Sequence, residues 1–314
     1  MRTVIETKGL VKSFGRRRVL DSLSLAVPGG CICGLVGSNG AGKTTLMMTL
    51  AGFLRPDGGE ISLLGEGPFD ADVHRGRFAV LPQDSELPGS SSAFELLRYY
   101  GLLQGLPVRQ AEASASEMLR AVNLSDRANS PVRTLSHGMK KRVMTAQCFL
   151  GTPEVVLLDE PLNGLDPVEA ASLRRFIRGR KGKQSVLVSS HNLHDIEQVC
   201  DRVIFMEQGK VVRTASIDEL TGRSSVLRYR LSEVPTGFAE FDRVLEGQAA
   251  FDWIADRTTV VCRYDGGRYR PEEVNALLLP LFFRYGVLSV EQGCSLEEEF
   301  LRIRHPSEKK SGSV

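Results

Sequence analysis

The sequence predicts an α/β fold in two parts: a domain at 1–222 with a helical subdomain at about 84–150, then a small α+β domain at 223–304. Three observations support this prediction. An apolar run at 31–36 leads into a glycine-rich turn and an apolar helix. A second apolar run at 155–158 ends in two acids, as a buried parallel strand does at a ligand-binding sheet edge. After 222 the pattern changes to short strands alternating with helices.

The turn after the first apolar run is a P-loop. It fits the pattern G-x-x-x-x-G-K-[ST], and its glycines let successive N–H groups turn inward around a phosphate chain. Lys43 would bring charge to the β- and γ-phosphates, and Thr44 would ligate Mg²⁺ at the start of a helix predicted at 43–54. A turn without a ligand is disfavoured, because strand, loop, Lys-Thr and helix follow in the required order. The candidate nucleotide-binding residues here are Gly37, Ser38, Asn39, Gly40, Ala41, Gly42, Lys43, Thr44 and Thr45.

Composition fits an ordinary globular chain. The 314 residues are 42% hydrophobic and 25% charged, and the net charge of +2 is too mild to indicate nucleic acid, so no direct nucleic-acid partner is expected. The six cysteines form no Cys-x-x-Cys pair, which favours reduced thiols in a cytosolic compartment over zinc or disulfides. No stretch approaches eighteen apolar residues, so a transport function would need a membrane-spanning part from another chain.

Two strands are predicted before the P-loop, at 2–9 and 18–27. Phe14 lies between them, and its ring could stack on an adenine because purines offer a flat face. Taken without context, a single Phe is a core residue more often than a ligand contact. The run Arg16-Arg17-Arg18 is interpreted as a solvated edge.

Polar candidates follow the P-loop helix. Strands are predicted at 61–64 and 77–81, and the second leads to Gln83, which could serve Mg²⁺ or an attacking water or be an ordinary loop residue. Helical periodicity then runs from 92 to 150. Within it, a Ser-x-Gly at a helix start, Ser136 and Gly138, could hold a phosphate on free N–H groups, although a simple helix cap is equally compatible.

The second apolar run ends in a Walker B pattern. Asp159 would hold Mg²⁺, commonly through water, and Glu160 could polarise a water for in-line attack on a γ-phosphate. The upstream P-loop disfavours the alternative of two surface acids. A strand predicted at 185–190 delivers His191 beside the Walker B strand, where it would reach a γ-phosphate, although a strand-end His is often a core residue. No third ligand accompanies His191 and His194, which excludes a zinc interpretation.

Together these motifs resemble the nucleotide-binding subunit of an ABC transporter over residues 1 to about 222. Walker A, the Q-loop Gln83, the signature at 135–139, Walker B, a D-loop ending at Asp166 and the switch His191 occur in the family's order. The Ser-x-Gly signature makes the resemblance specific, because many other P-loop proteins have only the two Walker motifs.

The resemblance implies an ATPase that uses ATP and Mg²⁺. Its catalytic residues would be Lys43, Gln83, Glu160 and His191. Its Mg²⁺ ligands would be Thr44, Gln83 and Asp159. Phe14 would be the aromatic A-loop residue, where the family more often has Tyr.

The resemblance also implies a dimer. Two domains would face head to tail, so that Ser136 and Gly138 of one subunit complete the ATP site of the other. Asp166, at the end of the D-loop, would also belong to the nucleotide-binding residues. The signature departs from Leu-Ser-Gly-Gly-Gln at His137 and Met139 but keeps the two phosphate-contacting positions. The chain would pair with itself or with a sister subunit, as a homodimer or heterodimer.

The subfamily resembled is the exporter branch, whose separate permeases form the ABC type-two family. The residues that support this are Leu-Ser-x-Gly-Met followed by Lys-Lys-Arg, and the segment 161–167. The implied protein lies at the cytoplasmic face of the membrane and drives a permease that selects the substrate. A soluble ABC ATPase acting on ribosomes or nucleic acid is the first alternative; it usually has two ATPase domains or a coiled-coil arm. The second, a non-enzymatic ATP-binding regulator, is disfavoured because the catalytic residues are all present.

The small second domain has the predicted order β-α-β-β-α-β, which suggests a ferredoxin-like sandwich. A regulatory or dimerisation role is the hypothesis, with a passive stabilising appendage as the alternative. Ser295 and Glu298 form a predicted capping box, and the polar tail at 305–314 is predicted to be disordered. The expected strands lie at 226–231, 249–254, 258–264 and 287–292, and the expected helices at 237–245 and 271–285.

Overall fold

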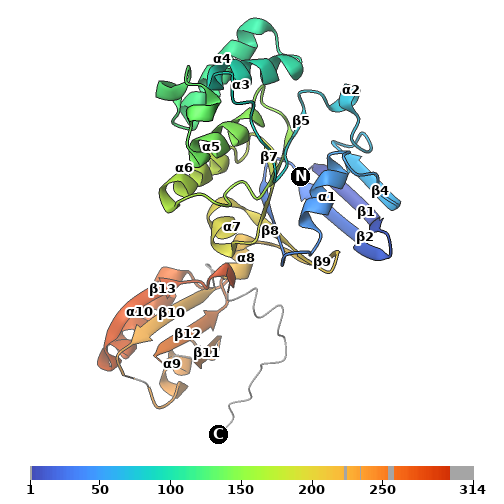
Figure 1. Ribbon diagram of the computed structural model, residues 1–314. Coiled ribbons are helices and arrows are strands. Elements are labelled where there is room, and N and C mark those ends of the chain that lie inside the picture. The colour runs from blue at the N-terminus through green and yellow to red at the C-terminus, as the bar shows by residue number, and fades with distance from the viewer. Residues whose placement is uncertain (1, 223–224, 234, 254–257, 298–314) are drawn as a thin grey trace. The chain divides into compact units, whose positions relative to one another are not determined.

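The computed structural model (Figure 1) describes residues 2–222, 225–233, 235–253 and 258–297. The chain divides into two compact units, Met1–Ala215 and Ser216–Val314. The division falls before the end of the first domain predicted at 222. Helix α8 (Ile217–Thr221) belongs to the second unit, where the Cys294 amide donates to the Thr221 carbonyl at 2.7 Å.

The first unit is built on a six-stranded sheet in the order β5-β6-β7-β3-β8-β9. Each neighbouring pair from β5 to β8 is parallel. All residues of β3, β6 and β7 are buried, as expected for central strands of a parallel sheet. The carboxyl ends of these three strands therefore meet at one edge of the sheet. The strands are β3 (Ile32–Val36), β5 (Phe78–Leu81), β6 (Val155–Asp159), β7 (Ser185–Ser190), β8 (Arg202–Glu207) and β9 (Lys210–Ser216).

A smaller antiparallel sheet, in the order β2-β1-β4, comprises β1 (Thr3–Phe14), β2 (Arg17–Pro28) and β4 (Gly58–Leu63). Helix α1 (Lys43–Leu50) packs against β2 and β6 and shares one buried core with both sheets. The sequence predicted this helix as far as 54. It ends earlier because Gly52 adopts a φ of 76°, which an α-helix cannot continue through.

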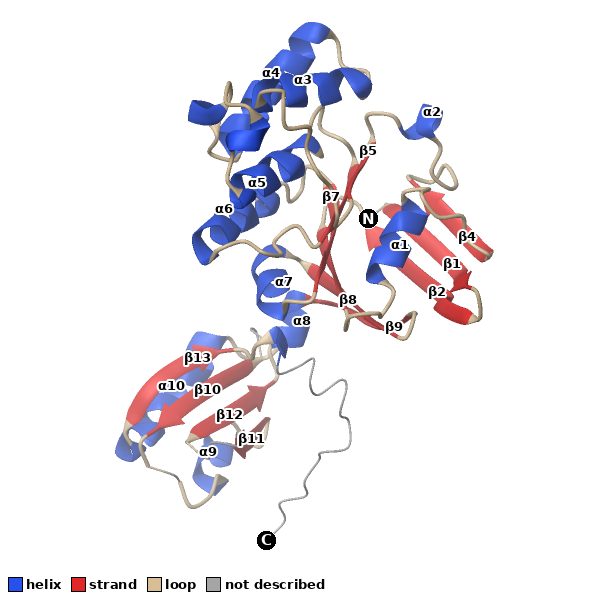
Figure 2. Ribbon diagram, in the orientation of Figure 1, coloured by secondary structure: helices blue, strands red, loops and turns tan. Residues whose placement is uncertain are grey.

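The predicted helical subdomain is present as α3 (Ala93–Leu103), α4 (Val108–Ala121) and α5 (His137–Gln147), which pack on one another (Figure 2). Ser92 and Glu95 form a capping box at the start of α3. Short helical turns lie at Ser125–Arg127 and Val132–Thr134, and the remaining helices of the first unit are α2 (Ala71–His74), α6 (Pro167–Arg178) and α7 (Leu193–Val199).

Gly34, in the middle of β3, lets α7 approach the central sheet. A Cβ at Gly34 would lie 2.6 Å from Ile196 Cγ2 and 3.2 Å from Cys200 Sγ, both on fully packed side chains. Gly34→Ala is therefore expected to destabilise the protein by about 1–3 kcal/mol, the cost of overpacking. Thermal unfolding tests this against Gly58→Ala, whose Cβ would meet only an ordinary 3.9 Å contact. Equal melting temperatures for the two variants would contradict the prediction.

The second unit has the predicted order β-α-β-β-α-β, and its antiparallel sheet has the order β11-β12-β10-β13. This strand order is that of a split β-α-β sandwich, which confirms the ferredoxin-like prediction. The Phe282 ring lies 4.3 Å from that of Phe241 and 4.4 Å from that of Tyr229, at the centre of the core. The elements are β10 (Val226–Leu231), α9 (Ala239–Val244), β11 (Ala249–Trp253), β12 (Thr259–Tyr264), α10 (Pro271–Phe282) and β13 (Val287–Gln292).

Helix α10 ends at Phe282, before the predicted 285, because the chain tightens into a 3₁₀ turn at Phe283–Tyr285 and then adopts a left-handed conformation at Gly286. The Glu298 half of the predicted capping box and the tail at 305–314 lie outside the described residues.

Candidate functional site

The P-loop wraps around the ammonium group of Lys43. Lys43 Nζ donates to the carbonyl oxygens of Gly37 at 2.8 Å and Ser38 at 3.4 Å, and the residue is buried. Gly40 and Gly42 have φ values of 82° and 102°, which only glycine adopts readily. A Cβ at Gly37 would overlap the Met206 carbonyl. The loop geometry therefore requires these glycines and fixes the cation at the start of α1.

The loop borders a cavity of about 530 Å³, within the range of small-molecule sites. Ten predicted site residues line it: Phe14, Asn39, Gly40, Gly42, Lys43, Thr44, Thr45, Gln83, Glu160 and His191. Three lining residues were not predicted as site residues: Arg17, Val19 and Asn163. Residues from both sheets thus meet at the edge formed by the carboxyl ends of β3, β6 and β7.

The two acids at the end of β6 are held by one hydroxyl from the neighbouring strand. Ser189 Oγ donates to Asp159 Oδ1 at 2.5 Å and accepts from the Glu160 amide at 2.9 Å. Asp159 and Ser189 are fully buried. The second carboxylate oxygen, Asp159 Oδ2, is buried with no hydrogen-bond partner among the described residues. An orphaned carboxylate oxygen fits a magnesium site, because Mg²⁺ prefers oxygen ligands and binds through one or two carboxylates.

Glu160 is fixed at its side chain by His191. The distance between Glu160 Oε2 and His191 Nδ1 is 3.0 Å, and Oε1 has no hydrogen bond to any described residue. Glu160 has a φ of 49°, an unusual value for a non-glycine residue and one that clusters at functional sites. Its side chain is 9% exposed while that of His191 is 53% exposed. The arrangement can therefore place a carboxylate oxygen and an imidazole beside a bound substrate.

A buried cation on α5 faces the same acids. Burial lowers the pKa of Lys141 below its ordinary value, and the negative charges of Asp84, Asp159 and Glu160 oppose that shift. The signature helix therefore contributes positive potential to the acidic end of β6.

Phe14 ends β1 and is 50% exposed, so it is not a core residue. It pairs across the hairpin with Arg17, and Lys12 Nζ lies 5.6 Å from its ring centroid. Arg17 faces the P-loop, with Nη2 3.5 Å from where a Cβ at Gly40 would lie. Arg17 is exposed, as the solvated-edge interpretation of this run predicted, and it also contributes to the cavity wall.

Ser136, Gly138 and Asp166 do not line this cavity. Ser136 caps α5, its Oγ accepting from the Met139 amide at 3.1 Å. Asp166 caps α6, its Oδ1 accepting from two amides at 2.9 Å. The Glu169 carboxylate packs directly on Gly138, where any Cβ would collide with it. Within one chain, the signature is thus separate from the P-loop.

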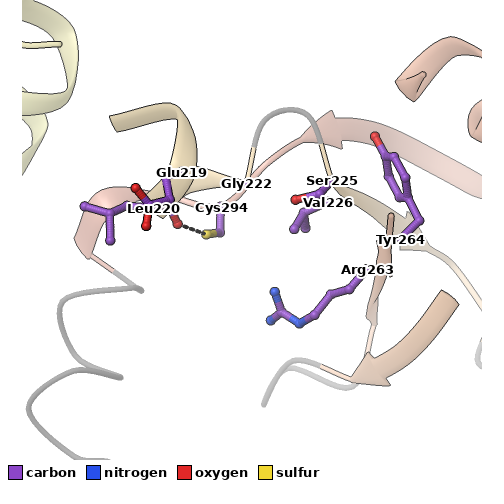
Figure 3. A pocket seen from close by; sticks show the side chains of 8 residues that line it. All are labelled: Glu219, Leu220, Gly222, Ser225, Val226, Arg263, Tyr264 and Cys294. Carbon is purple, nitrogen blue, oxygen red and sulfur yellow. Dashed lines mark hydrogen bonds between the residues drawn. The ribbon is translucent and has the colours of Figure 1, made fainter. Parts of the chain in front are cut away.

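A second cavity, of about 310 Å³, lies in the second unit (Figure 3). Figure 3 shows Arg263 and Tyr264 leaving β12 in opposite directions, and Cys294 Sγ directed at the Leu220 carbonyl, 3.6 Å away. Within the ranges that the structure covers, no group of three or more His, Cys, Asp or Glu side chains could hold a metal ion. The assembled chemistry that we identify therefore lies in the first unit.

Known proteins resemble this chain in sequence and fold. The ABC transporter family model matches residues 20–163. The daunorubicin/doxorubicin resistance ATP-binding protein DrrA of Streptomyces peucetius is 32% identical, over 98% of this chain and 94% of its own. The chain belongs to the ABC transporter family. The Nod factor export ATP-binding protein I of Burkholderia lata is 31% identical to this ABC subunit, over 95% of this chain and 96% of its own.

A solved ATP-binding subunit of an ABC transporter superposes with a TM-score of 0.62 and 29% identity, covering 70% of this chain and 92% of that one. The predicted fold class, ATPase activity and resemblance to the exporter branch are confirmed, and the soluble alternative is not favoured. This ABC subunit hydrolyses ATP to drive transport through a membrane partner. None of its described helices combines the length and apolar character needed to cross a bilayer.

Proposed function

We propose that this ABC subunit powers export of a substrate through a separate permease, at the cytoplasmic face of the membrane. The observation that supports the energy-coupling role is the meeting of Lys43, Glu160 and His191 at one cavity. Export is supported by relatives that align over nearly the whole chain and whose names refer to drug resistance and Nod factor export. The permease selects the substrate.

The P-loop binds the phosphates of ATP. Lys43 is already held at the loop by two carbonyl oxygens. Its side chain therefore loses little conformational entropy when its ammonium group contacts the β- and γ-phosphates of bound ATP. Thr44, at the start of α1, lines the same cavity together with Asn39 and Gly40. The positive end of α1 adds to the attraction for phosphate.

Glu160 is the general base. It accepts a proton from the attacking water through the oxygen that His191 leaves free, while His191 keeps the carboxylate aimed at the cavity. Asp159, Thr44 and Gln83 would hold Mg²⁺, and the orphaned Asp159 Oδ2 is the structural reason to include the aspartate. When bound, the metal neutralises charge on the phosphates.

The complete ATP site requires a second subunit. Ser136 is exposed at the start of α5, whereas Gly138 is buried beneath Glu169. Neither lines the cavity of its own chain, and the exposed Ser136 suits a contact with ATP bound by a partner. The capping hydroxyl of Ser136 and the free amides of the first turn would then meet the phosphate. ATP binding would close this head-to-tail dimer, and hydrolysis would open it.

A groove in the first unit suits a helix of the permease. It adjoins the loop after β5, so that Ser85 and Glu86 line the groove while Gln83 lines the ATP cavity. Leu103 is 57% exposed at its wall, and the side-chain oxygens of Gln104 and Gln147 are buried without hydrogen-bond partners among the described residues. A docked helix would cover the apolar wall and satisfy the amides. It would also press on the loop that reaches ATP.

The second unit is proposed to support the dimer or regulate it. The DrrA relative aligns over 98% of this chain, so the second unit belongs to the shared architecture. Deletion of residues 223–314 that left dimerisation, stability and transport unchanged would refute this role.

The export proposal is tested by capturing tagged Glu160→Gln protein from detergent-solubilised host membranes with ATP present, followed by mass spectrometry. A stoichiometric polytopic membrane protein is the expected companion. If the protein is instead recovered with ribosomal or DNA-repair proteins and without a membrane protein, the permease proposal is overturned. The result would then support a soluble ABC ATPase that acts on ribosomes or nucleic acid. Deleting the gene for the captured permease should abolish transport to the same extent as deleting this subunit.

Phe14 is proposed to stack on adenine. Phe14→Ala should weaken ATP binding by roughly 5- to 100-fold, the size of a base–aromatic stacking contribution, whereas Phe14→Tyr should bind ATP as the native chain does. Equilibrium titration with a fluorescent ATP analogue measures the effect. Phe53→Ala removes a similarly exposed ring outside the cavity and is the matched control. Equal affinities in Phe14→Ala and Phe53→Ala would exclude stacking by Phe14.

A further inference from the structure

We propose that Ser189 is a positioning residue for ATP hydrolysis, which sets both acids at the end of β6 through one buried hydroxyl. The inference rests on the proposed roles of Asp159 and Glu160. Ser189 itself does not line the ATP cavity, so it acts through these two residues.

The parallel pairing of β6 and β7 determines which residue can do this. Their register places Ser189 directly beside Asp159, the last residue of β6. The serine is fully buried, so water cannot replace it as a partner for either acid. A residue without a hydroxyl at this position would leave the Glu160 amide and Asp159 Oδ1 buried without their present partner.

The hydroxyl acts on Asp159 by selecting one carboxylate oxygen. Ser189 Oγ donates its hydrogen to Oδ1 at 2.5 Å, which fixes the rotation of the carboxylate. The other oxygen, Oδ2, is consequently the one without a partner in the described part of the chain. Ser189 therefore determines which lone pairs of Asp159 remain available to Mg²⁺, in the way that a hydrogen-bonded neighbour orients a metal-binding carboxylate.

The same hydroxyl acts on Glu160 through its backbone. Ser189 Oγ accepts from the Glu160 amide at 2.9 Å, at the residue whose φ is 49°. An unfavourable backbone conformation persists only where its surroundings hold it. His191, which directly follows β7, pairs with the Glu160 side chain at 3.0 Å. The end of β7 thus fixes the general base at its backbone and at its carboxylate.

The test compares Ser189→Ala with Ser185→Ala. Ser185 lies at the other end of β7, is also buried, and accepts a hydrogen bond from the Gly30 amide at 2.9 Å. Ser189→Ala should lower kcat roughly 10- to 100-fold, the size expected for loss of a hydrogen bond to a charged group, with little change in KM. Ser185→Ala should retain native turnover. Ser189→Thr keeps the hydroxyl and should recover most of the lost rate.

A readout besides turnover separates positioning from general stability. Mn²⁺ binding in the presence of a non-hydrolysable ATP analogue, followed by electron paramagnetic resonance, should weaken about tenfold in Ser189→Ala and remain near native in Ser189→Thr. Binding of the same analogue without metal should be unchanged in all three variants. Turnover and Mn²⁺ affinity in Ser189→Ala equal to those in Ser185→Ala would overturn the inference, as would a folded Ser189→Thr protein as impaired as Ser189→Ala.

The positioning role of Ser189 and the general-base role of Glu160 can be refuted separately. If native protein hydrolyses ATP and Glu160→Gln does not, while Ser189→Ala behaves as native, only the positioning role is lost. If Glu160→Gln hydrolyses ATP at the native rate, the assigned role of Glu160 fails first.

Discussion

Glu160→Gln is expected to lower the rate of ATP hydrolysis by roughly 10²- to 10⁴-fold, the usual contribution of a general base. Gln has the same shape and can still pair with His191, so the loop and the cavity wall should be preserved. The amide cannot take a proton from water, which removes the chemical role and leaves the binding surface. ATP affinity should therefore stay within about threefold of the native value, because the phosphate contacts come from the P-loop.

Single-turnover hydrolysis and equilibrium ATP binding measure the two effects separately. Glu154→Gln is the control, because Glu154 precedes the same strand and makes a surface ion pair with Arg77 at 2.7 Å. That variant should hydrolyse ATP at the native rate, since an exposed ion pair contributes little. ATP-dependent dimers should accumulate in Glu160→Gln, because the closed state forms and is not reset. Hydrolysis near the native rate in Glu160→Gln would assign the base elsewhere.

The P-loop and Walker B residues were predictable because each motif is a short, continuous segment. The order strand, glycine-rich loop, Lys43 and helix fixes the local geometry almost regardless of the rest of the chain. The site also required β3, β6 and β7 to be parallel neighbours, so that their carboxyl ends meet. Unbroken apolar runs indicated buried parallel strands, and right-handed crossovers leave few other arrangements.

Ser189 could not be predicted as part of the site, because its role depends on strand register. It hydrogen-bonds residues 29 and 30 positions away, and a shift of one residue would turn its side chain to the other face of the sheet. Arg17 presents a similar difficulty. The charge run correctly indicated that Arg17 is exposed, but its place in the cavity wall depends on the hairpin pairing with Phe14.

The second unit shows what periodicity does and does not determine. The sequence predicted the elements from β10 to β13 within a few residues but not α8, and the strand order then followed from the β-α-β-β-α-β sequence. Helix ends were less predictable, as at Phe282, where the chain tightens before Gly286. The start of the unit was placed too late because α8 belongs with it through the hydrogen bond between Thr221 and Cys294, which are distant in sequence.

Lys43→Ala is expected to weaken ATP binding by roughly 10- to 100-fold, the cost of losing one hydrogen bond to a charged group. The lysine is buried at 7% exposure, so its charge is poorly screened and no solvent cation can readily replace it. Turnover should fall further than affinity, because charge moves onto the phosphate oxygens during the reaction and Lys43 interacts most strongly at that point.

Titration with a fluorescent ATP analogue and steady-state hydrolysis at saturating ATP measure these effects. Lys210→Ala is the control, since Lys210 is 60% exposed and pairs with Asp21 at the surface. Far-ultraviolet circular dichroism should show both variants folded, because the hydrogen bonds of Lys43 Nζ to described residues go to two loop carbonyls, those of Gly37 and Ser38. Native ATP affinity in Lys43→Ala would contradict the P-loop assignment. Both residues line one cavity. If Glu160→Gln binds ATP but does not turn it over, whereas Lys43→Ala loses both, binding and chemistry are assigned to different residues of that cavity, which no single substitution could establish.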